Sequence, residues 1–214
     1  MNATVATPLD RYDALKDAVQ FFSAMYAGQT GILELRTVPL QQTLEQRRIA
    51  ARLRDFVPVV QGRFDVQRID RFMKETTRLH MAAYFGVALR TPQAARDRKG
   101  SAPYCQTLTV LFVDADFKHL GEAVTRKRLA EFPIPPSIIV NSGGGLHPYW
   151  LLRQPLDLQD NYRDAQSILR RLAKGVADIV DESVSEPARI LRVPGSFNFK
   201  KEYGEPRRVV VEQI

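Results

Sequence analysis

The segment at residues 110–116, Val-Leu-Phe-Val-Asp-Ala-Asp, constrains the fold of this chain more than any other part of its sequence. Four consecutive apolar residues are typical of a strand buried in a sheet, and this run ends abruptly in two acids. Side chains alternate between the two faces of a strand, so Asp114 and Asp116 are expected to point the same way. The sheet must therefore bury the strand and leave two carboxylates together at its end.

A divalent-metal site is the simplest explanation of this acid pair. Two carboxylates held side by side repel each other unless a cation lies between them. Mg²⁺ favours a few carboxylate oxygens together with substrate phosphates. The alternative is that Asp114 and Asp116 only cap a turn over residues 117–121, which is a common role of Asp at the end of a strand.

A second segment, at residues 137–150, runs from a predicted strand through three consecutive glycines into another strand. Glycines allow backbone N–H groups to approach an anion closely, and Ser142 and His147 add side-chain donors at either end of the bend. We predict a cradle for a triphosphate, which includes Gly143 and Gly144. The Gly-Lys-Ser/Thr ending of a Walker loop is absent, so ATPase chemistry is not supported. The alternative is a hairpin turn with a histidine in the core.

A third segment, at residues 181–201, combines an acid with several cations. Arg189, Arg192 and Lys200 offer donors, and the planar fork of arginine suits bidentate binding of phosphate. Asp181 could complete a carboxylate triad with the acid pair. The alternative is an ordinary turn with surface salt bridges, each of which stabilises the fold little.

Together the three segments resemble motifs I, II and III of the archaeo-eukaryotic primase superfamily, in particular the primase-polymerase branch found on plasmids, phages and other mobile or CRISPR-associated elements. The acid pair resembles motif I, and Ser142-Gly-Gly-Gly-Leu-His147 resembles motif II in a glycine-expanded form. Residues 189–200, Arg-Ile-Leu-Arg-Val-Pro-Gly-Ser-Phe-Asn-Phe-Lys, resemble motif III, with Ser196 where the family usually has Thr. Residues 84–90 resemble the strand before motif I, so the similarity spans roughly residues 80–202.

The resemblance implies a site that draws on all three motifs. Its third carboxylate is Asp181 by likeness to motif III, with Glu186 as the alternative because it also precedes Arg189. Two Mg²⁺ or Mn²⁺ ions would be held by Asp114, Asp116 and Asp181, which are then the catalytic residues. The nucleotide-binding residues that the resemblance implies are Ser142, Gly143, Gly144, His147, Arg189, Arg192, Asn198 and Lys200.

The implied activity is that of a template-dependent nucleotidyltransferase, a DNA primase and DNA polymerase. Its partners would be a single-stranded DNA template with a primer, and dNTP or NTP substrates. The alternatives are a metal-dependent nuclease and a non-catalytic module that binds single-stranded nucleic acid. A nuclease has no need of donors that grip three phosphates, and intact Asp114, Asp116 and His147 argue against a module without activity. The sequence leaves open the choice between dNTPs and NTPs, de novo priming, and the biological pathway.

The implied fold is α+β: an RRM-like antiparallel sheet packed by helices, with a smaller N-terminal α/β lobe. We expect one catalytic core over residues 1–214, with lobes at 1–82 and 83–214, from a longer protein whose C-terminal part is an accessory, helicase or CRISPR-associated region. The hydrophobic pattern agrees with this class, because helices and strands alternate along the chain. The predicted helices are at 9–27, 41–56, 65–81, 122–132 and 160–180, and the predicted strands at 32–38, 83–90, 108–114, 137–141, 146–152, near 190 and at 209–212.

Two basic segments are candidates for contacts with the template. The helix at residues 41–56 carries four arginines, and the loop at residues 90–101 carries four further cations. Both charge runs can equally be solvated faces. The net charge of +7 and the pI near 9.7 suit a polyanionic partner.

The composition also excludes several classes of protein. Cys105 is the only cysteine, which excludes an internal disulfide and any multi-cysteine zinc or iron–sulfur site. The first residues lack a signal-peptide pattern, and no apolar run approaches the roughly 18 to 20 residues that a membrane helix needs. We expect a soluble protein of the reducing cytoplasm, without contact to a membrane.

Overall fold

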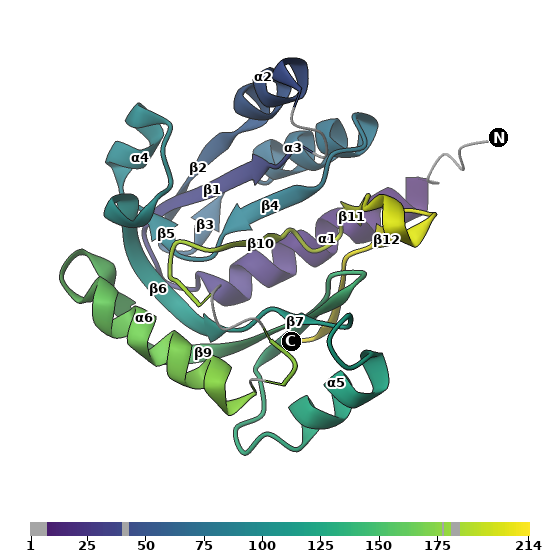
Figure 1. The fold of residues 1–214 in the computed structure, drawn as a ribbon. Helices are drawn as coiled ribbons and strands as arrows, with labels where there is room; N and C mark the ends of the chain where they lie inside the picture. Colours follow the sequence, from purple (N-terminus) through teal and green to yellow (C-terminus); the bar gives the residue numbers. More distant parts are fainter. Residues whose placement is uncertain (1–7, 40–42, 177, 181–184) are drawn as a thin grey trace.

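Helix α1 (Pro8–Met25) packs against a curved sheet that runs through the molecule (Figure 1). The computed structural model describes residues 8–39, 43–176, 178–180 and 185–214. Along the sheet the strands follow the order β10-β4-β1-β5-β6-β9-β8-β13, while β2 and β3 extend β1 and β7 pairs with β9. Every strand pairing within these ranges is antiparallel, so the predicted α+β class with an antiparallel sheet is confirmed.

The strands are short except for β9, and the sheet contains strands from both halves of the sequence. They are β1 (Gly31–Thr37), β2 (Asp55–Val60), β3 (Arg63–Phe64), β4 (Ala83–Gly86), β5 (Leu89–Arg90), β6 (Cys105–Phe112), β7 (Ala115–Asp116), β8 (Ile138–Asn141), β9 (Gly145–Asp157), β10 (Ile190–Arg192) and β13 (Val210–Gln213). A separate hairpin pairs β11 (Phe197–Asn198) with β12 (Arg207–Arg208).

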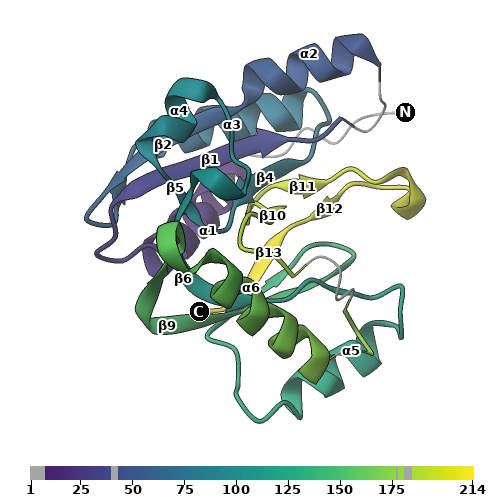
Figure 2. The same cartoon turned by 60° about the vertical axis from the view of Figure 1, so that its left-hand side comes forward.

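Five further helices cover the two ends of the sheet. They are α2 (Leu44–Leu53), α3 (Val66–Arg78), α4 (Pro92–Asp97), α5 (Glu122–Ala130) and α6 (Leu158–Gly175). Figure 2 shows α2 and α4 on the upper half, α5 and α6 on the lower half, and the β11–β12 hairpin between the halves. None of the described helices is both long and apolar enough to span a membrane.

Capping side chains explain where several helices begin. Thr43 accepts a hydrogen bond from the backbone of Gln46 at the start of α2, and Asp157 accepts one from Gln159 at the start of α6. Asp65 accepts two such bonds at the start of α3. Each cap satisfies backbone N–H groups that have no partner within the helix.

The core joins the two halves of the sheet through α1. The ring of Phe21 lies 5.3 Å from that of Phe85 on β4 and 5.2 Å from that of Tyr149 on β9, both edge to face. All three side chains are fully buried. The sheet also crosses the predicted lobe boundary, because β1 pairs with both β4 and β5. The division at residue 82 itself stays a prediction.

Some predicted boundaries are wrong, and burial explains why. The helix predicted at 41–56 ends at Leu53, because Phe56 belongs to the next strand, β2, where its side chain is buried. The loop predicted after Arg90 contains α4, which starts at Pro92. The strand predicted at 108–114 begins earlier, at Cys105, and ends at Phe112, which leaves Asp114 in the link before β7.

The turn that follows β10 is fixed directly against α1. Gly195 has a φ of 80°, which favours glycine, and a Cβ at this position would collide with the carbonyl oxygen of Ala14. The N–H of Gly195 donates to the carbonyl oxygen of Val209 at 2.7 Å. The glycine of the third motif, Gly195, is therefore required by its backbone conformation and by packing against the first helix.

Candidate functional site

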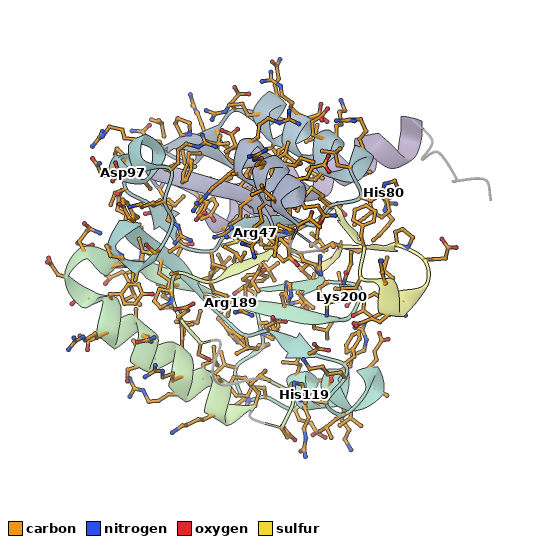
Figure 3. All side chains as sticks on the ribbon, turned by 45° about the horizontal axis from the view of Figure 1, so that its top comes forward. Arg47, His80, Asp97, His119, Arg189 and Lys200 are labelled. Carbon is orange, nitrogen blue, oxygen red and sulfur yellow. The ribbon has the colours of Figure 1, made fainter. Side chains whose placement is uncertain are left out.

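The predicted motifs meet at one cleft of about 280 Å³. Asp114 lines it from the link between β6 and β7, Asp116 from β7, and His147 from β9. Arg192 lines it from β10, and Arg189 from the position just before β10. Figure 3 labels Arg189 and Lys200, which both lie on this cleft, with His80 and Asp97 toward opposite edges of the view. The cleft is lined by Tyr84, Asp114, Asp116, Lys118, Ser142, Gly144, Gly145, His147, Arg189, Ile190, Leu191, Arg192, Asn198, Lys200 and Tyr203.

Asp114 lies between the side chains of His147 and Arg189. Its Oδ1 is 3.4 Å from Nε2 of His147, and its Oδ2 is 3.6 Å from Nη2 of Arg189. Burial alone would raise the pKa of Asp114, but the hydrogen bond from His147 and the charges of His147 and Arg189 outweigh burial and hold the pKa well below its usual range. Asp114 is therefore an anion at neutral pH.

Asp116 is held by the turn that follows it. Its Oδ1 accepts a hydrogen bond from the backbone of Lys118 at 3.0 Å, and its Oδ2 lies 3.1 Å from Nζ of the same residue. This backbone hydrogen bond caps the turn, which was the alternative role that we predicted for Asp116. The carboxylate nevertheless lines the cleft with Asp114, so the two readings are compatible.

The three glycines allow close packing of the loop between β8 and β9. Gly143 has a φ of 82°, and a Cβ on Gly144 would collide with the hydroxyl of Tyr203. The N–H of Gly143 donates to Asn141 Oδ1 at 2.9 Å, and Ser142 Oγ donates to the carbonyl oxygen of Gly145 at 3.1 Å. Ser142 and Gly144 line the cleft, whereas Gly143 lines a neighbouring hollow.

The β11–β12 hairpin closes one side of the cleft. Asn198 is buried, donates to the carbonyl oxygen of Ser142 at 2.9 Å and accepts from the backbone of Lys200 at 3.2 Å. Arg207 donates to the carbonyl oxygen of Gly143 at 2.8 Å. Asn198 thus fastens the glycine loop to the hairpin, while Lys200 keeps a partly exposed ammonium group beside Glu202.

Six residues of the cleft lining were not predicted as site residues: Tyr84, Lys118, Gly145, Ile190, Leu191 and Tyr203. The guanidinium of Arg192 lies over the ring of Tyr84, 5.0 Å from its centroid. Lys118 forms a salt bridge with Asp116, and the guanidinium of Arg207 lies 4.0 Å from the ring centroid of Tyr203. Tyr84 belongs to the strand that resembles the one before motif I, which was a usable signal. Lys118 lies in a turn and Tyr203 in a short 3-10 helix (Lys201–Tyr203), and no sequence pattern distinguishes either from a solvent-exposed segment.

Three side chains of the cleft each have a buried nitrogen without a hydrogen-bond partner among the described residues. These atoms are Nδ1 of His147, Nε of Arg189 and Nη1 of Arg192. Buried polar atoms in folded proteins almost always have partners, and an orphaned one calls for a specific explanation. An anionic ligand in the cleft would complete the hydrogen bonds of the two guanidinium groups.

A buried ion network supports the segment before β10. Arg90 is fully buried, donates from Nε to Glu34 Oε2 at 3.0 Å and from Nη2 to the carbonyl oxygen of Ala188 at 3.2 Å. Arg54 donates to the other oxygen of Glu34 at 3.0 Å. Arg90 itself is therefore part of the core and not available to nucleic acid, whereas contacts of the other cations in the loop at residues 90–101 stay a prediction.

The third carboxylate was expected at Asp181, with Glu186 as the alternative. Asp181 lies outside the described residues. Its neighbour Val180 forms an antiparallel bridge with Ala115, between the two acids of the pair. Glu186 is exposed and absent from the cleft lining. In the described ranges, no cluster of three or more His, Cys, Asp or Glu side chains could hold a metal.

No protein-family model and no curated sequence matches this chain, whereas several solved structures resemble it. The AEP domain of the cyanophage S-2L primase-polymerase matches with a TM-score of 0.56, over 93% of this chain and 92% of that one, at 13% identity. The chain has the archaeo-eukaryotic primase fold.

The same primase fold appears in two structures of primase RepB′. The first matches with a TM-score of 0.58 at 13% identity, and this chain covers 56% of that one. The second, its catalytic domain in complex with initiator DNA, matches with a TM-score of 0.52 at 12% identity, over 92% of this chain and 85% of that one. Likeness at such identities concerns the fold alone, so the chemistry must be argued from the cleft.

Proposed function

We propose that this chain is a template-dependent nucleotidyltransferase, a DNA primase-polymerase that joins nucleoside triphosphates on single-stranded DNA. The observation that carries the proposal is the cleft lined by Asp114, Asp116, His147, Arg189 and Arg192, in which Nε of Arg189 and Nη1 of Arg192 are buried without a partner among the described residues. A triphosphate would accept hydrogen bonds from these two guanidinium groups. The primase fold and the description of RepB′ in complex with initiator DNA support DNA as the template.

The donor set fits two divalent cations. Asp114 is ionised, Asp116 lines the same cleft, and oxygen ligands from carboxylates and phosphates are those that Mg²⁺ and Mn²⁺ prefer. We assign Asp181 as the third carboxylate, which the bridge between Val180 and Ala115 supports. When bound, the ions would neutralise phosphate charge and lower the pKa of the attacking 3′-hydroxyl.

The protein's own residues would bind and orient the triphosphate. Arg189 and Arg192 would donate to its oxygens from one wall of the cleft, and His147 from the other. Ser142, Gly144 and Asn198 would shape the floor, and Lys200 would add charge at the mouth. Donors fixed before the substrate arrives need little reorganisation during the reaction, so they stabilise the developing charge effectively.

The test is synthesis on an unprimed single-stranded template with labelled nucleotides and Mg²⁺ or Mn²⁺. The double variant Asp114→Ala/Asp116→Ala should lose template-dependent product by at least about 100-fold, the scale expected when charge stabilisation of a transition state is removed. The matched control, Asp164→Ala/Asp178→Ala, removes two exposed acids and should keep wild-type activity. Product that persists in the first variant contradicts the proposal. Strand cleavage that depends on Asp114 and Asp116, without synthesis, identifies a nuclease instead.

A further inference from the structure

A row of three side chains crosses the sheet beside the cleft. Tyr84 on β4 pairs directly with Arg36 on β1 and with Arg192 on β10. Residues directly opposite each other in antiparallel strands project from the same face. The next row along, Leu35, Phe85 and Leu191, belongs to the buried core with α1. The arginine row, Arg36, Tyr84 and Arg192, therefore lies on the face turned away from α1.

The positive charge of Arg36 is not neutralised by its neighbours. Glu34 is fully buried, and within the described ranges it is the one carboxylate paired with three arginines. Arg90 and Arg54 donate hydrogen bonds to its two oxygens. Nη1 of Arg36 lies 3.8 Å from Oε1 of Glu34. That distance is too long for a hydrogen bond. One carboxylate cannot balance three guanidinium groups, so a surplus of positive charge remains at this end of the row.

The surroundings of Arg36 favour an added anion. Burial and the charges of Arg54 and Arg90 lower its pKa from the ordinary value, against the opposing effect of Glu34. The guanidinium stays protonated, but its charged form is less stable here than in water. The side chain is nonetheless 38% exposed, so a ligand in solution can reach it.

We propose that Arg36 binds a backbone phosphate of the template strand, and that this strand passes Tyr84 to reach the cleft, where Arg192 holds the nucleotide. This inference rests on the proposed function. Arg36 is not part of the cleft lining, and β4 separates it from Arg192. Two strand spacings amount to about 10 Å. A ligand that occupies the cleft and continues past Tyr84 to Arg36 must carry phosphates at intervals, which describes a nucleic-acid strand.

The first experiment measures binding of a fluorescent single-stranded oligonucleotide by anisotropy at several salt concentrations, without nucleotide or metal. Arg36→Gln should reduce the slope of log K against log salt by about 0.7, the contribution of one phosphate contact on a single strand. The loss of affinity should be equal for oligo-dT and a mixed sequence, because phosphates carry no sequence information. Arg36→Lys should keep most of the slope, and the control Arg63→Gln, on exposed β3, should keep all of it.

A second measurement on the wild-type protein avoids any effect of substitution on folding. Phenylglyoxal modifies accessible arginines, and mass spectrometry locates the product. The oligonucleotide should protect Arg36 and leave Arg63 reactive. Equal reactivity of Arg36 with and without the strand, or an unchanged slope in a folded Arg36→Gln variant, overturns the inference. Protection by dNTP alone overturns it too, because the phosphate then belongs to the nucleotide. Failure of synthesis alone would contradict the proposed function and leave these binding results intact.

Discussion

Glu34 shows at the scale of one residue how far burial departs from a sequence pattern. In Gly31–Thr37 the alternation places Glu34 and Arg36 on the polar face, where a half-exposed strand would leave both in water. Glu34 is fully buried instead, and a Cβ on Gly100 would collide with its carboxylate. The pattern predicts the face but not the arginines, which come from elements distant in sequence.

Replacement of Glu34 by Gln should destabilise the fold by about 3–5 kcal/mol at pH 7, because Arg90 is left buried without a counter-charge. Burial raises the pKa of Glu34, but the charges and hydrogen bonds of Arg90 and Arg54 outweigh burial and lower it in the folded state. This stability is therefore present above the unfolded pKa of about 4.3 and is lost as the pH falls through the folded pKa. Urea unfolding at pH 7, 5 and 3.5 measures it.

The difference in stability between wild type and Glu34→Gln should be equal at pH 7 and 5 and smaller at pH 3.5. Glu205→Gln, which removes an exposed carboxylate, serves as the control and should change stability by no more than about 0.5 kcal/mol. A difference that stays constant down to pH 3.5 would contradict the assignment of the effect to the carboxylate.

At the scale of elements, most helices and several strands were predicted near their positions, including the short strands β8, β10 and β13, whereas β2, β3, α4, β11 and β12 were missed. The helices α1 and α3 and the strand β1 follow clear periodicity, and their positions agree with expectation. Two-residue strands such as β11 and β12 have no measurable period, so the hairpin that holds Asn198 was missed. The helix predicted at 160–180 overran the end of α6 at Gly175 because Val176, Ile179 and Val180 continue an apolar pattern that a second cluster buries.

Gly195→Ala tests the contact between two elements, the turn after β10 and α1. The substitution should destabilise the fold by about 2–3 kcal/mol, because it combines a left-handed φ with a collision against backbone atoms of Ala14. Thermal unfolding measures the change. Gly121→Ala is the matched control, since Gly121 also has a positive φ but has open space around its Cβ position. Equal loss in both variants would show that φ alone matters and that the packing against α1 does not.

At the scale of the whole molecule, the resemblance of three motifs predicted the fold class, whereas composition and periodicity could not give the strand order. The path β10-β4-β1 brings residues 190–192 beside residues 83–86 and 31–37. Such pairings form because segments that are distant in the sequence bury their side chains against each other. A single sequence does not show which segments do so. Both acids of the pair line one cleft with Arg189 and Arg192, as the three motifs led us to expect, and the chemical roles of these residues stay predictions.

Phe21→Ala should weaken both halves of the sheet together. Phe21 contacts Phe85 and Tyr149 through edge-to-face rings, and removal of a buried Phe costs about 3–5 kcal/mol. Urea unfolding should follow one transition by far-UV circular dichroism and by the fluorescence of Trp150, the single tryptophan. Phe132→Ala, which removes a ring beside Trp150 but not from the α1 core, is the comparison. Separate transitions in the Phe21 variant would show that the halves fold independently.

The contact of the Gly195 turn with α1 also bears on how the chain is made. A ribosome releases Ala14 long before Gly195 and Val209, which complete the surroundings of the first helix. The aromatic partners of Phe21 and Phe22 on this helix, Phe85 and Phe64, are synthesised earlier than the turn, so part of the core around α1 can form first. The contact between Gly195 and Ala14 can form only afterwards, when the turn after β10 has left the ribosome.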